Sequence, residues 1–262
     1  MANLYLNDTY LSRASLKVVQ VCPQPDGSTA FALADNIGRP QGGGQPADTC
    51  SFFHGNTRFE VRRTYKETER PFRILYEYLL YTHAPVAIGD VIDFHIDHER
   101  RLNLSRCHTL THVLMAAIRR RVDDYESRGA EILEDERTCR LWFASDAPLS
   151  EGSLKDIDLL ARAAITDNLP VMAVTEPSID TAKFKYDAWR VDPTLALKGK
   201  VRVIVIGDSW DANPCSGTHV RSTGEIGAFI IHSFGHNAQR QCWELRVRTS
   251  STWDKWYTES HD

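Results

Sequence analysis

The sequence SRCHTLTHVL occupies residues 105–114 and predicts a helix, because apolar side chains recur around it at helical spacing. The apolar residues of this pattern are Leu110, Val113, Leu114, Ala117 and Ile118. Asn103 or Ser105 could cap the start of the helix, and the three arginines at residues 119–121 suit the negative end of its dipole. We therefore expect a helix from about residue 105 to residue 127.

Two histidines on this helix could bind one metal ion. His108 and His112 are four residues apart, so a helix directs both side chains to the same face. The plain alternative is a core helix with two hydrogen-bonded histidines. A metalloprotease helix would carry a glutamate directly after the first histidine as its general base, and this chain has Thr109 there. The segment therefore argues against a protease.

A second pair, Cys215 and His219, lies far along the chain, after an expected strand and turn. Imidazole and thiolate are the usual ligands of tetrahedral zinc. If the two pairs converge, we expect His108, His112 and Cys215 to bind a catalytic Zn²⁺. His219 would then be a fourth ligand or a neighbour that handles a proton. Structural zinc is the alternative, although its ligands usually lie closer together in sequence.

His232 and His236 repeat the four-residue spacing, but they follow the strand-like residues 227–231. In an extended segment, side chains four residues apart are too far from each other to share an ion readily. We therefore interpret them as loop or surface histidines.

Composition sets the broad class of the protein. A chain of 262 residues with 42% hydrophobic residues predicts a globular protein of one large or two ordinary domains. It has no run of about 18 apolar residues and no signal-peptide pattern, so we expect neither a membrane span nor secretion. Six scattered cysteines fit a reducing cytoplasm. The net charge of −4 argues against a protein coated with nucleic acid but permits local basic patches.

Residues 1–100 are expected to be rich in β-strands and to form a compact sheet or small barrel. Short apolar runs alternate with turn signals, and a glycine-rich loop at residues 38–46 interrupts them. One helix is expected within residues 70–81, which are rich in Leu and Tyr. The expected strands are residues 16–21, 29–33, 52–53, 59–62 and 91–96.

Residues 101–262 alternate helices with strands, so the fold class is predicted to be α+β. A second helix is expected at residues 153–167, with Ser153 as a possible cap. The strand at residues 201–206 is expected to pair with another at residues 226–231. The remaining expected strands are residues 138–143, 171–174 and 242–247.

Three ordered segments resemble the AlaX-type alanyl-tRNA editing proteins and the editing domain of alanyl-tRNA synthetase. Residues 42–49, GGGQPADT, are similar to the family's Gly-Gly-Gly-Gln-Pro loop. Residues 108–112, HTLTH, are similar to its His-Thr-Ala-x-His motif, and residues 215–220, CSGTHV, to its Cys-Gly-Gly-Thr-His-Val motif. The order and separation of the segments match over roughly residues 20–235.

The resemblance implies a small β-barrel domain at residues 1–100, followed by a zinc-dependent α+β editing domain at residues 101–262. It implies hydrolysis of tRNA(Ala) wrongly charged with serine or glycine, by an enzyme acting in trans. It also implies that Thr109 helps to recognise serine, with a weaker case for Thr218. The loop residues implied to lie near the substrate are Gly42, Gly43, Gly44 and Gln45.

The chain departs from the family pattern at several positions near the expected pocket. Ser216 replaces a glycine after the cysteine, and Cys50 stands where a glycine commonly follows Asp-Thr. Residues 211–214 and 239–243 also differ from the usual sequences. None of these departures removes an expected ligand, so they put the amino-acid preference in doubt rather than the reaction.

A tRNA substrate requires cations that meet its phosphates. The candidates are paired or tripled arginines: Arg62, Arg63, Arg100, Arg101, Arg119, Arg120 and Arg121. Two alternatives to the editing enzyme stay open. One is a deacylase for a noncanonical aminoacyl-tRNA, and the other is a non-catalytic, zinc-stabilised tRNA-binding module. The sequence leaves the oligomeric state open.

Overall fold

The computed structural model describes residues 2–67, 73–79, 86–146, 148–186 and 199–250. The chain divides into two compact units, residues 1–42 with 46–102 and residues 43–45 with 103–262. The expected domain boundary, between residues 100 and 101, falls inside a helix that starts in the first unit and continues into the second. Along the described part of the chain, no helix combines the length and the apolar character needed to cross a membrane.

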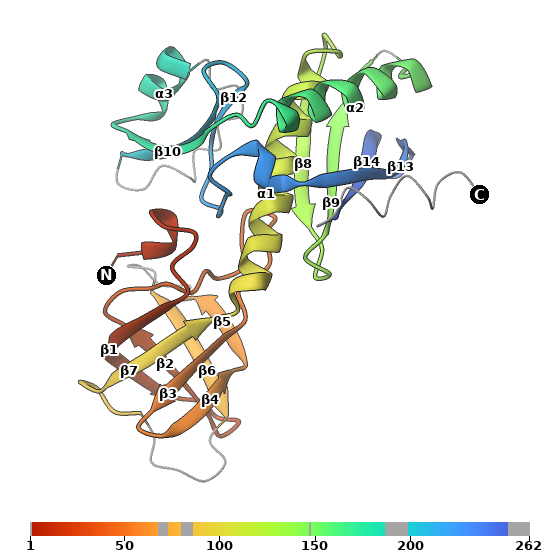
Figure 1. The fold of residues 1–262 in the computed structure, drawn as a ribbon. Coiled ribbons are helices and arrows are strands. Elements are labelled where there is room, and N and C mark those ends of the chain that lie inside the picture. The colour runs from red at the N-terminus through yellow and green to blue at the C-terminus, as the bar shows by residue number, and fades with distance from the viewer. Residues whose placement is uncertain (1, 68–72, 80–85, 147, 187–198, 251–262) are drawn as a thin grey trace. The chain divides into compact units, whose positions relative to one another are not determined.

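The first unit is built on one antiparallel sheet of seven strands in the order β4-β3-β7-β1-β2-β6-β5 (Figure 1). The two edge strands are joined at Arg62, whose backbone N–H donates to the carbonyl oxygen of Glu77 in β6 at 2.7 Å. The sheet is therefore nearly closed and barrel-like, as the sequence predicted. Its strands are β1 (Arg13–Pro23), β2 (Ser28–Leu33), β3 (Cys50–His54), β4 (Thr57–Val61), β5 (Arg63–Lys66), β6 (Ile74–Leu79) and β7 (Val91–Ile96), and a short 3-10 helix, η1, spans Leu4–Leu6.

Aromatic rings fill the interior of this sheet. Phe52 contacts Phe31 and Tyr78 edge-on, with ring centroids 5.1 Å apart in each pair, and Tyr76 packs on Phe94 at 4.6 Å. All five side chains are almost completely buried. Offset and edge-on aromatic pairs stabilise a core beyond the area that they bury. The small barrel is thus a packed core and not a channel.

The helix expected within residues 70–81 is wrong. Residues 74–79 form β6, which pairs with β2 and β5, and residues 70–72 and 80–81 lie outside the described residues. Tyr and Ile favour a strand when their side chains pack between neighbours on a half-buried sheet. Here Tyr76 and Tyr78 complete the aromatic core, and this packing between distant segments favours the strand over the helix that we expected from the local composition.

Arg101 is completely buried in the first unit. Its guanidinium forms a two-pronged ion pair with the buried carboxylate of Asp48 and donates to the carbonyl oxygens of Ile37 at 2.7 Å and Thr9 at 3.2 Å. A phosphate contact requires an exposed cation. The expectation that Arg101 binds tRNA is therefore corrected, because this side chain ties together the segments around the start of α1 (His98–Arg119).

Arg101→Met is expected to lower the free energy of unfolding by about 3–5 kcal/mol, because it leaves the carboxylate of Asp48 buried without its cation. Arg13→Met is a matched control, since Arg13 pairs with Asp93 while its side chain is 67% exposed, and such pairs contribute little. Urea unfolding followed by far-UV circular dichroism measures both. Equal midpoints for the two variants would contradict the structural role of Arg101.

The second unit contains two antiparallel sheets, of four strands in the order β13-β14-β9-β8 and of three strands in the order β10-β11-β12. The strands are β8 (Glu126–Ile132), β9 (Thr138–Ala144), β10 (Val171–Glu176), β11 (Val201–Ile206), β12 (Asp211–Pro214), β13 (Ala228–Asn237) and β14 (Cys242–Ser250). The helices are α1, α2 (Glu151–Thr166), α3 (Ile179–Tyr186) and the 3-10 helix η3 (Thr223–Ile226).

One core cluster joins α1 to both sheets and to α2. Leu110, Val113 and Leu114 of α1 are completely buried, and the same cluster includes Leu141 of β9 and Ile204 of β11. A helix surrounded by apolar neighbours has no wholly polar face. Its histidines therefore project from a rigid, buried element.

The second half shows which expectations from local pattern hold. Strands appear where they were expected near residues 138–143, 171–174, 201–206 and 242–247. The strand expected at residues 226–231 exists as β13, but it pairs with β14, while β11 pairs with β10 and β12. The expected pairing of residues 201–206 with 226–231 is therefore wrong.

Both expected helix starts are also wrong. Helix α1 begins at His98, where the carboxylate of Asp97 accepts the backbone N–H of Arg100 at 3.0 Å, so Asn103 and Ser105 lie inside the helix. It ends at Arg119 rather than near residue 127, and β8 begins at Glu126. Helix α2 begins at Glu151, capped by Ser150, which accepts the backbone N–H of Ser153.

Candidate metal centre

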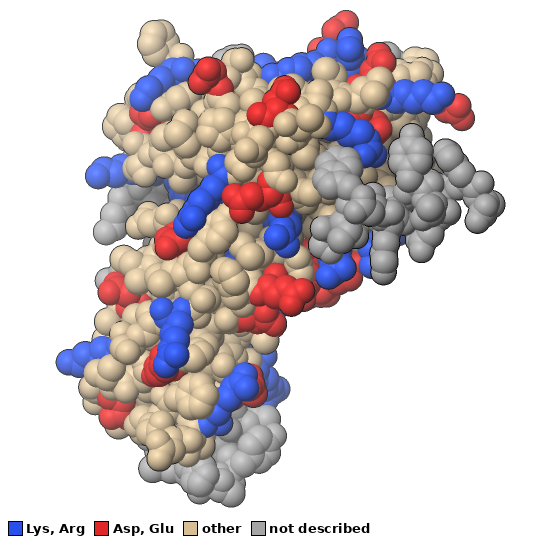
Figure 2. Space-filling view, viewed as in Figure 1, with Lys and Arg blue, Asp and Glu red and all other residues tan. Residues whose placement is uncertain are grey.

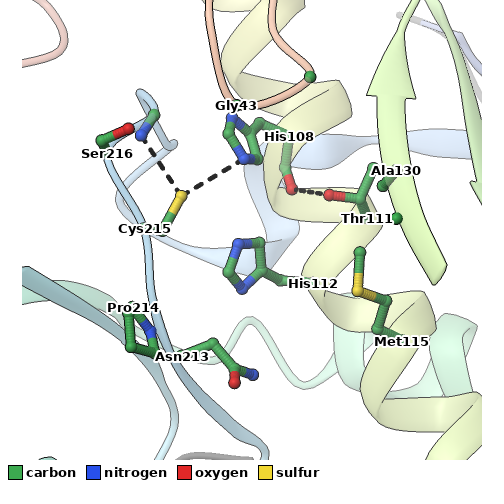
Figure 3. Close-up of a pocket in the computed structure, with 13 residues that line it drawn as sticks. Gly43, His108, Thr111, His112, Met115, Ala130, Asn213, Pro214, Cys215 and Ser216 are labelled. Atoms are coloured by element: carbon green, nitrogen blue, oxygen red, sulfur yellow. Dashed lines mark hydrogen bonds between the residues drawn. The ribbon is translucent and has the colours of Figure 1, made fainter. Parts of the chain in front are cut away.

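Four potential ligands converge inside the second unit. His108 and His112 project from adjacent turns of α1, and Cys215 follows strand β12 (Figure 3). His219, four residues after Cys215, completes the group. One ligand atom from each of the four lies within 4.8 Å of the others. The Cys215 Sγ lies 3.4 Å from His108 Nε2 and 3.3 Å from His219 Nε2. The two sequence pairs therefore meet in one buried cluster.

The turn after β12 places Cys215 opposite the helix. Its backbone N–H donates to the carbonyl oxygen of Arg202 in β11 at 3.1 Å. The Arg202 guanidinium donates in return to the carbonyl oxygens of Cys215 at 2.8 Å and Gly217 at 3.0 Å. The backbone N–H of Gly217 points at Sγ, 3.3 Å away. These hydrogen bonds fix the backbone of the turn and the position of the Cys215 sulfur.

The Nδ1 atom of each histidine in the cluster forms a hydrogen bond with a neighbouring side chain. His108 Nδ1 lies 2.7 Å from Oε1 of Gln45, and His112 Nδ1 lies 2.8 Å from Oδ2 of Asp211. Because amide and carboxylate oxygens accept, these contacts assign a ring proton to the Nδ1 atom of each histidine. Partners of this kind orient metal-binding imidazoles and raise their basicity.

The third histidine, His219, is held by a threonine. Its Nδ1 lies 3.2 Å from Oγ1 of Thr109, and this hydroxyl donates to the carbonyl oxygen of Ser105 at 2.9 Å. The hydroxyl proton is thus used elsewhere, so His219 Nδ1 must donate to Oγ1. Its Nε2 then faces Cys215, as a metal ligand requires.

The local electrostatics favour the ligand forms of the thiol and of His219. Burial raises the pKa of the Cys215 thiol, but its interactions with His108 and His219 outweigh this effect and lower that pKa well below its usual value. Burial lowers the pKa of His219 well below its usual value, so its imidazole is neutral. Burial also lowers the pKa of His112, but the hydrogen bonds of Asp211 and Cys215 prevail and raise it to about 9.

This donor set fits zinc. Neutral imidazole nitrogens and a thiolate are the ligands that Zn²⁺ prefers, and tetrahedral geometry needs no more than four of them. His232 and His236 lie in the extended strand β13, and within the described ranges they join no group of metal-ligand type. Both residues are exposed, as expected of surface histidines.

A cavity of about 260 Å³ opens beside the cluster (Figure 3). Its walls include Gly43 and Gly44 of the glycine-rich loop, Thr111 and Met115 of α1, and the residues from Asn213 to Gly217. The carbonyl oxygen of Gly44 accepts the backbone N–H of Ile132 in β8 at 2.7 Å. A Cβ at Gly44 would lie 2.2 Å from the carbonyl oxygen of Ala130, so glycine is required there.

Three residues expected near the substrate lie behind the ligands instead. Thr109 is completely buried and contacts His219, and Thr218 is completely buried and contacts Gln45 and Ser105. Gln45 itself supports His108. None of the three lies among the described residues that line the cavity, whereas Thr111, which the sequence analysis did not select, does. In the structure Thr109 contacts His219 of the cluster, and its role in recognising serine stays a prediction.

The arginine candidates occupy different environments. Arg100 donates to the carbonyl oxygen of Ala47, and Arg121 lies 3.9 Å from the carboxylate of Asp156. Arg120 donates to the carbonyl oxygens of Ser209 and Trp210. On the face shown in Figure 2, Lys and Arg side chains are interspersed with Asp and Glu. A tRNA contact must therefore be argued from individual residues and not from one broad basic face.

Asp211→Asn is expected to weaken zinc binding about 10- to 100-fold, because the amide keeps the shape of the side chain but removes the charge that supports His112. Competition with a chromophoric chelator measures the affinity. Asp208→Asn is the matched control, since Asp208 is exposed and lies outside the cluster. Equal affinities for the two variants would show that Asp211 does not support a metal ligand.

Comparison with known proteins shows which proteins this chain is similar to. Residues 201–241, which include Cys215 and His219, match the family described as "Threonyl and Alanyl tRNA synthetase second additional domain". The chain is 31% identical over 234 residues to an alanine–tRNA ligase of Caldivirga maquilingensis, covering 87% of this chain and 24% of that protein. It is 31% identical over 231 residues to one from Saccharolobus islandicus, with the same coverage. The chain therefore spans about a quarter of the length of these curated relatives.

Proposed function

Since this chain is an AlaX-like homologue of part of the alanine–tRNA ligases, we propose that it is an aminoacyl-tRNA deacylase. Its substrate is tRNA(Ala) mischarged with serine or glycine, and the bond that it hydrolyses is the ester at the terminal ribose. One observation carries the proposal. Three imidazoles and a thiolate, each held in place by a hydrogen bond, meet in one cluster, and His108, His112 and Cys215 of this cluster line a cavity.

His108, His112 and Cys215 would hold Zn²⁺, and His219 would be the fourth ligand or a proton carrier. The ion would supply a Lewis acid that polarises the ester carbonyl and acidifies water, so no covalent nucleophile is needed. The position of His219 Nε2, 3.3 Å from Sγ, supports the ligand role.

The surrounding residues position the cluster and shape the cavity. Gln45, Asp211 and Thr109 fix the three rings, so the donor atoms need not reorganise when substrate binds. The cavity wall carries the polar side chains of Thr111, Asn213 and Ser216. A site that hydrogen-bonds a substrate hydroxyl can discriminate strongly, and this supports serine over alanine as the amino acid removed.

The two compact units, residues 1–42 with 46–102 and residues 43–45 with 103–262, support a barrel domain and an editing domain, although their bounds differ from the expected 1–100 and 101–262. The six cysteines are all free, which supports a reducing compartment such as the cytoplasm.

The test of the proposal is release of the amino acid from Ser-tRNA(Ala), Gly-tRNA(Ala) and Ala-tRNA(Ala). We expect fast release of serine or glycine and no release of alanine. Loss of a different, noncanonical amino acid, with all three of these esters spared, would assign the protein to another aminoacyl-tRNA.

A second candidate function is a non-catalytic tRNA-binding module stabilised by zinc. It is favoured by one observation, the presence of four ligand atoms close enough to close a tetrahedral site. This candidate predicts that a chelator lowers the melting temperature sharply and that no ester is hydrolysed. The deacylase predicts a folded, inactive protein after chelation.

A further inference from the structure

A second cavity, of about 560 Å³, lies in the second unit beside the C-terminal end of α1. This volume is in the range of small-molecule sites. Three cationic and three aromatic side chains contribute to its lining: Arg119, Arg120, Lys185, Phe184, Tyr186 and Trp210. The metal ligands do not line it, so it is a separate site.

The three aromatic side chains differ in their contacts and in their exposure. Trp210 lies beneath the guanidinium of Arg120, 4.3 Å from the ring centroid, and Tyr186 donates to Glu176 at 2.9 Å. Phe184 is 94% exposed at the edge of the cavity. It projects from α3, which packs on the three-stranded sheet through the buried Ala182 (Figure 1). A single exposed Phe means little, but here the ring borders a cavity that also carries cations.

Two arginines of the cavity, Arg119 and Arg120, offer positive charge to an anion. Arg120 donates to the carbonyl oxygens of Ala116, Ser209 and Trp210, which fix its position but carry no full negative charge. Two carboxylates also line the cavity: Asp208 is exposed, and Asp211 is bonded to His112 and Asn213. Lys185 is paired with Glu176 at 3.0 Å, so Arg119 and Arg120 are the cations considered for a ligand. Cations beside an aromatic face suit a nucleotide, since phosphates pair with arginines and bases stack on rings.

The two cavities share one strand. Asp211 and Ala212 of β12 line the second cavity, and Asn213 and Pro214 of the same strand line the first. Three residues of extended chain span roughly 10 Å. A nucleotide in the second cavity would therefore lie close to an ester at the metal centre.

We propose that the second cavity binds an unstacked nucleotide of the single-stranded 3′ end of a tRNA, with the base on Phe184 and phosphate at Arg119 and Arg120. The identity of the RNA as the substrate rests on the proposed function. Single-stranded RNA is the form that exposes a base for stacking on an aromatic side chain.

The test measures binding of uncharged, fluorescently labelled tRNA(Ala) by anisotropy. Phe184→Ala is expected to raise the Kd about 5- to 100-fold, as loss of one base–aromatic contact does. Arg119→Ala is expected to raise the Kd and to lower the slope of log K against log salt by about one. The matched controls are Leu159→Ala, at a side chain 64% exposed on α2, and Arg128→Ala, at one 52% exposed on β8, and both should bind as the wild type does.

Two further ligands, a truncated tRNA and AMP, distinguish the 3′ end of a tRNA from a free nucleotide as the occupant of the second cavity. A tRNA that lacks its last three nucleotides should bind more weakly than the intact tRNA and should be insensitive to Phe184→Ala. The pocket proposal fails if both pocket variants bind intact tRNA as the wild type does, or if the wild type binds no tRNA. It also fails if AMP alone binds as tightly as tRNA, because the ligand would then be a free nucleotide.

Hydrolysis, measured in parallel, keeps the two proposals apart. Binding that depends on Phe184 without any release of amino acid would overturn the deacylase and leave the pocket. Rapid release of serine with unchanged binding by both variants would overturn the pocket and leave the deacylase. Phe184 is almost fully exposed, so equal melting temperatures for wild type and Phe184→Ala are expected.

Discussion

Cys215→Ala is expected to abolish zinc binding and to slow the release of serine from Ser-tRNA(Ala) about 1,000-fold or more. The sulfur lies within 3.4 Å of two imidazole nitrogens, so its loss removes the donor around which the other ligands gather. A bound metal contributes several kcal/mol to stabilisation of the transition state, and each 1.36 kcal/mol is a tenfold change in rate. His108→Ala is expected to give the same result.

Cys22→Ser is the matched control for this prediction. Cys22 is a free, half-buried thiol of the first unit and is not a member of the cluster, so its loss should leave zinc content and hydrolysis unchanged. Metal analysis of the purified proteins accompanies the rate measurement. Retained hydrolysis in a Cys215→Ala protein shown to lack zinc would remove this residue from the chemistry.

Gly217→Ala is expected to reduce hydrolysis about 100-fold, because misplacement of a catalytic group by about 1 Å has effects of this size. A Cβ at Gly217 would lie 2.0 Å from Cε1 and 2.2 Å from Nδ1 of His108, and 2.9 Å from Oε1 of Gln45. The His108 ring would have to move, and its bond to Gln45 would break. Zinc affinity should fall together with the rate.

Gly235→Ala controls for the general effect of adding a methyl group to a glycine of this unit. A Cβ at Gly235 would have no heavy atom within 4 Å, and this residue lies in β13, away from the cluster. Wild-type rates are expected for this variant. If Gly217→Ala also keeps the wild-type rate and affinity, the position of His108 is not set by the close packing described above.

The ligands could be found in the sequence because their spacing is local. Residues four apart on a helix share one face, as His108 and His112 do, and a tight turn keeps Cys215 near His219. Their supporting partners could not be found in this way. Gln45 is 63 residues from His108 and Asp211 is 99 residues from His112, so only the folded chain brings them together. The one signal available was an acidic residue shortly before the cysteine.

In the fold, too, features set by local sequence were predictable, and features set by contacts between distant segments were not. Strands with continuous apolar runs, such as β11, were predictable, because few other elements carry that pattern. The strand β6 and the pairing of β13 with β14 depend on contacts between distant segments, which local propensity does not report. Helix α3 has little apolar periodicity and exposes Phe184, so no pattern indicated it.

The burial of Arg101 illustrates a further limit. A charged side chain is almost always exposed unless it is paired, and the sequence shows no sign that Asp48 lies beside it. A tract of basic residues therefore predicts nucleic-acid contact poorly. The structure separates Arg101, which stabilises the first unit, from Arg119, which lines a cavity.

The most direct test of the account is single-turnover hydrolysis of Ser-tRNA(Ala) by one preparation in three states: as purified, stripped of metal, and resupplied with one equivalent of Zn²⁺. Far-UV circular dichroism would follow the fold throughout. We predict that stripping abolishes release of serine without unfolding the protein and that Zn²⁺ restores it. An unchanged rate in protein shown to contain no metal would contradict a catalytic centre formed by His108, His112, Cys215 and His219.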